Sequence, residues 1–167
     1  EEGEVRIARA SAGITLPARF LLVGATNPCP CGGGAPGACV CNETARSKYL
    51  RRLSGPFLDR FDLRVAVAMT GVEELLDVRE GEPSAVVQER VARVREMSLH
   101  RSGGVNARLS AQELDTYAPL SPAARDVLRR ELELGRLTGR GYHRIRRVAR
   151  TLADLAGNEG EIAHETV

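Results

Sequence analysis

The sequence predicts an α/β unit followed by an all-helical unit. Residues 20–25 are continuously apolar, which is typical of a strand buried in a parallel sheet. From Ser84 onward, apolar residues recur at helical spacing, and several segments begin with good capping residues. An apolar share of 43% in 167 residues is enough for one domain of ordinary size, or for a small core with a satellite. We therefore expect the end of an α/β core over 1–70, a linker over 71–83 and a helical domain over 84–167.

Strands are predicted at three places in the α/β unit. Residues 4–10 alternate apolar and charged side chains, which indicates a half-exposed strand, and 19–26 form the buried strand. A third, short strand is expected over 63–69. Asn42 is a good N-cap for a helix, which the Gly-Pro pair at 55–56 brings to an end.

Local motifs place the helix starts in the second unit. Ser110 and Glu113 have the spacing of a capping box. Ser121 with Pro122 is typical of an N-cap followed by the first helical residue. A last long helix is expected over 138–155. The inward faces are predicted to hold Val86, Val87, Val91, Val94 and Met97 in the first helix, and Ile145, Val148, Leu152 and Leu155 in the last.

Composition limits the class of protein. The net charge of +2 argues neither for nor against a nucleic-acid partner. No apolar run approaches the roughly 20 residues that span a bilayer, and the first residues are not those of a signal peptide. We therefore expect a cytoplasmic protein with no membrane partner. The strand expected over 4–10 has nothing before it, and the helix expected to begin near 162 is cut at its first turn, so we expect a piece of a longer protein.

All four cysteines lie within thirteen residues, in a loop over 28–42. Zn²⁺ in a structural site takes four thiolates presented by two tight turns, and such a site leaves no open position for catalysis. The C-x-C pairs are tighter than the usual C-x₂-C spacing, and disulfides or free thiols remain alternatives. A disulfide within either pair would be strained, and the cytosol disfavours disulfides. We predict a structural metal site, with Zn²⁺ as the ion, formed by Cys29, Cys31, Cys39 and Cys41.

Two further side chains stand at places where phosphate chemistry is expected. Asn27 ends the apolar strand, where an amide can orient a water or contact a phosphate; the alternative is that Asn-Pro only starts a turn. Arg60 lies between apolar residues that fix its backbone, and a rigidly held guanidinium can stabilise a phosphoryl group, including one on a neighbouring subunit. For Arg60 the alternative is an ion pair with Asp59 or Asp62.

An arginine-rich segment opens the last helix. Arg140, Arg144 and Arg147 share one helical face, at steps of four and three residues. This face can meet the phosphates of a nucleotide or of DNA, and the alternative is a solvated basic surface. His143 is expected to be a surface or partly buried polar residue.

Taken together, three segments resemble the AAA+ ATPases of the magnesium-chelatase-like group, most closely its ComM/YifB branch. They are Ala-Thr-Asn-Pro-Cys-Pro-Cys-Gly at 25–32, Ser-Gly-Pro-Phe-Leu-Asp-Arg-Phe-Asp-Leu at 54–63 and the arginine-rich helix at 141–157. They occur in the order found in that branch, and the resemblance covers nearly the whole chain. The cysteine loop distinguishes the branch from the chelatase subunits. By this resemblance, 1–70 is the C-terminal part of the AAA+ core and 84–167 is its helical lid.

The resemblance implies a role for each candidate residue. Asn27 matches sensor-1, which orients the attacking water, and Arg60 matches the arginine finger offered to ATP on the adjacent subunit. Arg140 matches the sensor-2 arginine of the lid. Arg6 and Arg9, in a hairpin that points into the pore of related ring helicases, are candidate DNA contacts. The implied parent is a homo-oligomeric ring, a hexamer, that uses ATP and Mg²⁺ and promotes branch migration of DNA during DNA uptake.

One departure from the family pattern limits what the chain does alone. The 167 residues contain no G-x-x-x-x-G-K-[ST] phosphate loop and no acidic strand end for Mg²⁺, and the family keeps both upstream of the matched segments. We therefore expect the parent to be an ATPase and this chain alone to be inactive. The alternatives are a magnesium chelatase ATPase subunit and a stand-alone, zinc-stabilised module that binds nucleic acid.

Overall fold

The computed structural model describes residues 3–9, 12–33, 38–53, 55–68, 70–72, 76 and 81–167. The chain divides into two compact units, Glu1–Ser54 and Gly55–Val167. Most of the predicted linker lies outside the described residues, as do Ser11 at the predicted hairpin tip and 34–37 in the cysteine loop. The boundaries expected from the sequence, which placed the division within 71–83, stay a prediction.

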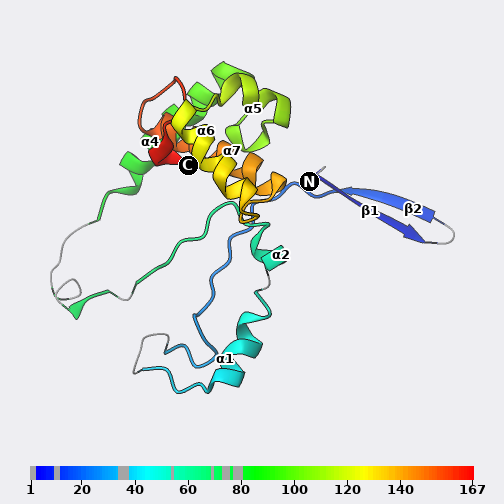
Figure 1. Ribbon diagram of the computed structural model, residues 1–167, viewed down its shortest axis with the longest axis vertical. Coiled ribbons are helices and arrows are strands. Elements are labelled where there is room, and N and C mark those ends of the chain that lie inside the picture. Colours follow the sequence, from blue (N-terminus) through cyan, green and yellow to red (C-terminus); the bar gives the residue numbers. More distant parts are fainter. Residues whose placement is uncertain are drawn as a thin grey trace. The chain divides into compact units, whose positions relative to one another are not determined.

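A β-hairpin forms the first regular element. Strand β1 (Glu4–Arg9) pairs antiparallel with β2 (Ala12–Pro17) in a two-stranded ribbon (Figure 1). The register sets Val5 opposite Leu16 and Ile7 opposite Ile14, so four β-branched or aliphatic side chains share one face of the ribbon. All residues of both strands are exposed.

The strands predicted over 19–26 and 63–69 are wrong. The second strand of the hairpin ends at Pro17, and the described residues 18–27 and 61–68 have no regular secondary structure. Phe20, Leu21 and Val23 are 76%, 88% and 82% exposed. An apolar strand needs a hydrogen-bonded neighbour to hold it in a sheet, and among the described residues no strand pairs with 19–26 or 63–68. In the described part of the chain, the mixed α/β class therefore consists of helices and a small two-stranded sheet.

Helix α1 (Glu43–Leu50) follows the cysteine loop and begins where the sequence indicates. The Asn42 side chain accepts a hydrogen bond from the Ala45 backbone N–H at 2.8 Å, which satisfies one free donor of the first turn. No residue of α1 is buried. Its place in the unit is therefore set by hydrogen bonds and by the loop before it rather than by packing.

The second unit contains the long helices. The short α2 (Gly55–Leu58) comes first, and the others pack together (Figure 1). Local motifs predicted two helix starts well: Ser110 and Glu113 form both hydrogen bonds of the capping box, and Ser121 caps its helix. Thr138, predicted as the first residue of the last helix, is its N-cap. No helix in the described part of the chain has the length and apolar character needed to cross a membrane. The elements are α4 (Ser84–Ser102), η1 (Asn106–Arg108), α5 (Ala111–Tyr117), α6 (Pro122–Glu133), α7 (Gly139–Leu155) and η2 (His164–Thr166).

The core of this unit lies between α5, α6, α7 and the C-terminal segment. A parallel bridge between Leu120 and Ile162 ties that segment to the α5–α6 connection. Small alanines allow the helices to approach closely at this point. The buried cluster consists of Leu109, Leu114, Ala118, Leu120, Ala124, Leu128, Ala149 and Ile162.

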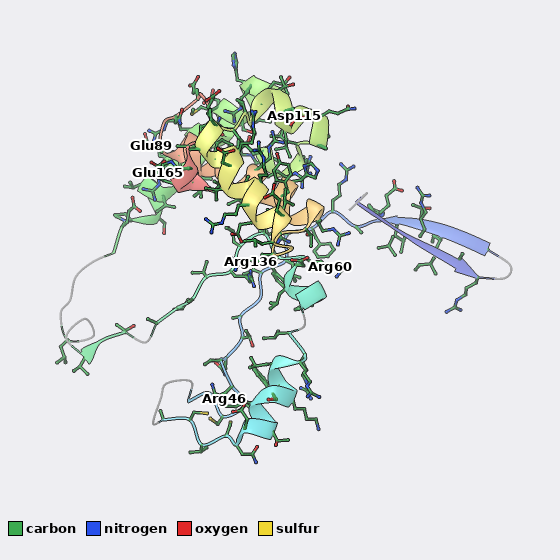
Figure 2. The ribbon with its side chains drawn as sticks, in the orientation of Figure 1. Arg46, Arg60, Glu89, Asp115, Arg136 and Glu165 are labelled. Carbon is green, nitrogen blue, oxygen red and sulfur yellow. The ribbon has the colours of Figure 1, made fainter. Side chains whose placement is uncertain are left out.

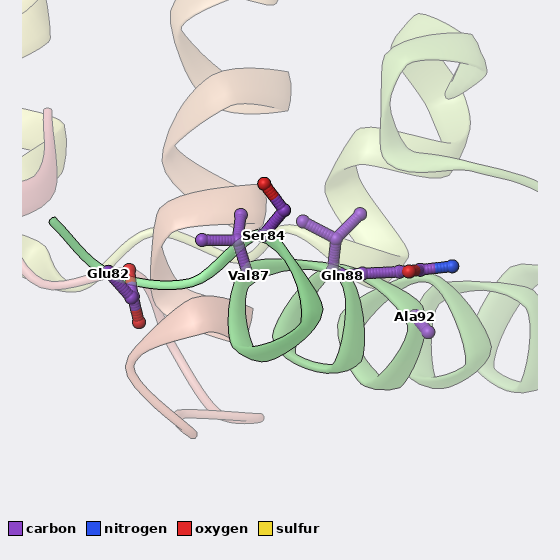
Figure 3. A pocket seen from close by; sticks show the side chains of 6 residues that line it. Glu82, Ser84, Val87, Gln88 and Ala92 are labelled. Atoms are coloured by element: carbon purple, nitrogen blue, oxygen red, sulfur yellow. The ribbon is translucent and has the colours of Figure 1, made fainter. Parts of the chain in front are cut away.

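The predicted inward faces are correct only in part. Ile145 packs against the core, but Leu152 and Leu155 of α7 are 46% and 38% exposed. In α4, Val94 is buried, whereas Val86 and Val91 are exposed. The apolar N-terminal half of α4 borders a shallow pocket of about 430 Å³ (Figure 3). Periodicity located these helices but did not identify the residues that pack, because the polar side chains described below occupy buried positions of α7.

Candidate functional site

The four cysteines come together as the sequence predicts. Their Sγ atoms all lie within 4.8 Å of one another. The Sγ of Cys29 is 3.3 Å from that of Cys31 and 3.6 Å from that of Cys39, and Cys31 and Cys39 are 3.8 Å apart. These distances exceed the roughly 2.05 Å of a disulfide. In a tetrahedron with Zn–S bonds of about 2.3 Å, the sulfurs are separated by about 3.8 Å.

Two glycines shape the loop around the sulfurs. Gly32 has φ +77°, in the left-handed region, and its N–H donates to the Cys29 carbonyl at 3.1 Å, closing the turn between the first two cysteines. At Gly33 a Cβ would lie 2.4 Å from the Ala38 carbonyl oxygen, so only glycine lets the two arms of the loop approach this closely. The turn chemistry thus brings the two C-x-C pairs together.

The thiols share protons unevenly. Hydrogen bonds from the Gly33 and Val40 backbone, and then from Cys29 and Cys41, lower the pKa of Cys31 to about 6. The hydrogen bond to Cys31 is the main cause that raises the pKa of Cys41 to about 11. The arrangement favours negative charge on the Cys31 sulfur and a proton on the Cys41 sulfur. A divalent cation would bind all four sulfurs as thiolates, so the donor set fits a thiolate-binding metal.

Asn27 lies beside this loop, at the end of the extended segment 18–27. The Tyr49 hydroxyl of α1 donates to the Asn27 carbonyl at 3.0 Å and is 2.8 Å from the Thr26 hydroxyl. The Asn27 side chain reaches over the first cysteine turn, because a Cβ on Gly32 would lie 3.7 Å from its Nδ2. The backbone before the cysteine loop is therefore tied to the helix after it.

In the second unit, Arg60 and Arg140 border the same pocket. Gly55 and Asp59 complete its lining, and its volume is about 380 Å³. Arg60 follows α2 (Figure 2). The rings of Phe57 and Phe61, which precede and follow Arg60 in sequence, contact each other edge to face with centroids 5.1 Å apart. Both arginines are exposed. Two guanidinium groups at one pocket make a favourable site for a phosphate.

Arg144 and Arg147 of α7 bind neighbouring segments of the protein. Arg144 donates to the Asp59 carbonyl, and its Nη2 is 3.7 Å from the Asp59 carboxylate. Arg147 donates to the Leu109 carbonyl at 2.8 Å. For Arg144 and Arg147 the structure therefore differs from both alternatives, a phosphate-binding face and a solvated one, since their guanidinium groups hold neighbouring segments in place.

Sequence reasoning missed a buried polar network around α7. Asp154 is 2% exposed and Arg150 is fully buried, with Arg150 Nη2 3.0 Å from Asp154 Oδ1. Arg101 of α4 binds both carboxylate oxygens, at 2.7 and 2.5 Å, and Asn106 Nδ2 donates at 2.8 Å. Burial alone would raise the pKa of Asp154, but these hydrogen bonds and the arginine charges lower it. The sequence signal was the polar stripe Arg146, Arg150 and Asp154 at steps of four.

The predicted DNA contacts lie on opposite faces of the hairpin. The strand register places Arg6 opposite Thr15 and Arg9 opposite Ala12, and side chains of a strand alternate between faces. Arg6 is also 3.6 Å from Glu4. The two arginines do not form one basic patch, and their role as DNA contacts stays a prediction.

With these sites in place, comparison with known proteins defines the class. Residues 1–75 match the family described as magnesium chelatase, subunit ChlI, and residues 81–167 match the family described as magnesium chelatase, subunit ChlI C-terminal. The chain belongs to this magnesium-chelatase-like family of AAA+-like proteins.

Its relatives place the chain in the ComM/YifB branch. Competence protein ComM of Haemophilus influenzae is 42% identical over 160 residues, which are 95% of this chain and 31% of the relative. The uncharacterized proteins YifB of Salmonella typhimurium and Escherichia coli are each 40% identical, over 93% of this chain and 31% of the relative. The chain thus spans about a third of the length of these relatives.

Proposed function

We propose that the chain is part of an AAA+ ring motor that hydrolyses ATP and acts on DNA. The observation that carries this proposal is the pocket that Arg60 and Arg140 share. Phosphoryl transfer requires positioned positive charge more than covalent chemistry by the protein. Similarity over 95% of the chain to a relative named Competence protein ComM supports the same conclusion.

Each candidate residue has one role in this proposal. Asn27 acts as sensor-1 and orients the attacking water. Arg60 acts as the arginine finger on ATP held by the adjacent subunit. Because Arg140 borders the same pocket as Arg60, we assign it to the same nucleotide, as the sensor-2 arginine.

The whole protein is proposed to bind ATP and Mg²⁺ and to assemble as a homo-oligomeric ring, a hexamer, in the cytoplasm. Its substrate is DNA, contacted by Arg6 and Arg9 of the hairpin. One relative is named a competence protein, which supports a helicase role in branch migration while incoming DNA recombines. Cys29, Cys31, Cys39 and Cys41 would hold a structural Zn²⁺, which cross-links the loop without taking part in hydrolysis.

Mixed rings of whole-protein variants test these roles. Arg60→Ala, Arg140→Ala and Asn27→Ala are each expected to lower kcat for ATP, the first by about 10³-fold. Mixing Asn27→Ala with Arg60→Ala subunits restores turnover, because an intact Asn27 then meets an intact Arg60 across an interface. Mixing Arg60→Ala with Arg140→Ala subunits restores nothing, since both groups come from the same subunit.

Two outcomes contradict the proposal. Absence of ATP turnover by the wild-type whole protein removes the motor function. Recovery of activity in the Arg60→Ala and Arg140→Ala mixture would show that Arg140 serves the nucleotide of its own subunit. The 167-residue chain alone is expected to show no turnover, because it holds no phosphate loop.

A magnesium chelatase ATPase subunit is the second candidate, supported by the descriptions of the matched families. Stimulation of the ATPase by DNA favours the motor, whereas ATP-dependent insertion of Mg²⁺ into a porphyrin favours the chelatase. A stand-alone nucleic-acid module would instead bind DNA as a monomer of this chain, with affinity that falls steeply with salt.

A further inference from the structure

Tyr49 connects the two ends of the cysteine loop. Its hydroxyl donates to the Asn27 carbonyl at 3.0 Å and lies 2.8 Å from the Thr26 hydroxyl, so hydrogen bonds across 22 and 23 residues of sequence meet at one atom. The segment enclosed by these contacts contains all four cysteines. Tyr49 is only partly exposed, although α1 has no buried residue.

The cysteine loop fixes where α1 begins. Cys41 directly precedes Asn42, whose side chain caps the helix through the Ala45 N–H at 2.8 Å. Tyr49 lies about two helical turns further on. A metal bound to Cys41 and the other cysteines would therefore set the position of α1, and with it the place of the Tyr49 hydroxyl.

The same loop also approaches Asn27 from the other side. Cys29 is two residues after Asn27, and it is the only buried hydrophobic residue among those described in Glu1–Ser54. The Asn27 amide lies over Gly32, in the turn that joins the first two cysteines. The Asn27 backbone is thus bound by Tyr49, and the Asn27 side chain lies near the turn that joins the first two cysteines.

We propose that Tyr49 is a positioning residue, which holds the Asn27 backbone so that the order of the metal-loaded cysteine loop is transmitted to the Asn27 amide. This inference rests on the proposed role of Asn27 in ATP hydrolysis. Tyr49 itself contacts no nucleotide in this scheme. Its hydroxyl fixes the carbonyl next to the side chain that orients water, and a small error in that orientation reduces turnover more than it reduces binding.

The test uses the whole protein with Zn²⁺ bound and the substitution Tyr49→Phe, which removes one hydroxyl and leaves every cysteine in place. We expect kcat to fall about fivefold, the effect of one hydrogen bond, with KM for ATP unchanged. Thr26→Val is expected to lower kcat in the same direction, whereas Thr26→Ser keeps the hydroxyl and retains activity. Tyr117→Phe, which removes a hydroxyl in the helical unit, serves as the matched control.

A double-mutant cycle separates positioning from general stability. Tyr49→Phe is expected to cause no further loss of kcat when Asn27 is already alanine, because its effect passes through Asn27. Zinc content per subunit is expected to stay the same. Hydrogen exchange of the α1 amides should rise in Tyr49→Phe, a readout independent of turnover, because the hydroxyl tethers a helix that has no buried residue.

Several outcomes overturn the inference. Wild-type kcat in Tyr49→Phe would show that the hydroxyl positions nothing. An equal fall in kcat when Tyr49→Phe is added to Asn27→Ala would show that Tyr49 does not act through Asn27. A fall in zinc content in Tyr49→Phe would show that Tyr49 supports the metal site instead. A wild-type protein without ATP turnover contradicts the proposed function instead, so the two failures are distinguishable.

Discussion

The two units of the chain are stabilised by different means. Gly55–Val167 has a contiguous apolar core and a buried polar network, in which Asp154 is bound by Arg101, Asn106 and Arg150. Among the described residues of Glu1–Ser54, Cys29 is the only buried hydrophobic residue. The helical unit can therefore keep its structure through burial, whereas the cysteine unit depends on cross-links, either hydrogen bonds or a metal.

This difference explains how the candidate residues are positioned. Arg140 stands on α7, a helix whose buried side anchors it in the core. Asn27 stands at the end of an exposed segment, where the Tyr49 hydroxyl binds its carbonyl and its side chain lies near the cysteine turn. The helical unit therefore supports Arg140 rigidly. The support of Asn27 in the cysteine unit would depend on whether a metal is bound to the four cysteines.

The largest effect is expected from removing the metal or one of its ligands. Structural zinc in small sites contributes about 10 kcal/mol or more to folding. Chelation, or Cys29→Ser, should make the 28–42 segment sensitive to protease, because little apolar burial remains to hold it. The thermal unfolding of the helical unit should not change. Metal analysis and limited proteolysis measure the first effect, and circular dichroism measures the second.

Continued resistance of the 28–42 segment to protease after removal of the metal would contradict the expected dependence of the cysteine unit on its cross-links. A simultaneous loss of helical signal would show that the second unit also depends on the cysteines. Either result would mean that the two units are not stabilised independently.

The next largest effect is expected from Asp154→Ala in the helical unit. The substitution leaves Arg150 fully buried without its carboxylate partner, which typically costs about 3–5 kcal/mol. The free energy of unfolding, measured with urea and circular dichroism, should fall by this amount. Asp126→Ala is the control, because the Asp126–Arg129 pair is 69% and 60% exposed and should contribute little. Equal effects of the two substitutions would contradict the assignment of the network to the core.

A smaller difference is expected between two helix caps. Ser110→Ala removes the cap of α5, whose Leu114 is fully buried, and should lower the free energy of unfolding by about 1 kcal/mol. Asn42→Ala removes the cap of α1 and should leave the melting of the helical unit unchanged. A shift in that melting with Asn42→Ala would show that α1 supports the core after all.

The smallest effect is expected on the stability of the helical unit at acid pH. The backbone hydrogen bond from Ser110 lowers the pKa of Glu113. A carboxylate with a lowered pKa in the folded state contributes stability above its unfolded pKa, which is about 4.3, and this stability is lost as pH falls through the lower folded value. Glu113→Gln should therefore reduce the loss of stability below about pH 4, seen as a flatter dependence of urea midpoint on pH. An unchanged profile would show that the capping box is not maintained in solution.

Local motifs predicted the parts of the fold that close within a few residues. The predicted caps Asn42, Ser110 and Ser121 all bind the backbone N–H three residues ahead, so sequence spacing alone specifies them. The cysteine cluster was predictable for a related reason, since glycine turns in a short loop leave few ways to arrange the four thiols. The sequence determined these features and the family.

Tertiary structure decided everything that needs a distant partner. The burial of Arg150 with Asp154 depends on Arg101, which is 53 residues from Asp154 in sequence, so periodicity assigned the inward positions to Leu152 and Leu155 instead. Arg60 and Arg140 share a pocket only because α7 and α2 approach each other. Hydrogen bonds between residues three or four apart can be predicted from the local sequence. A buried charge is tolerated only when the folded chain places a partner beside it, and that partner can be far away in sequence.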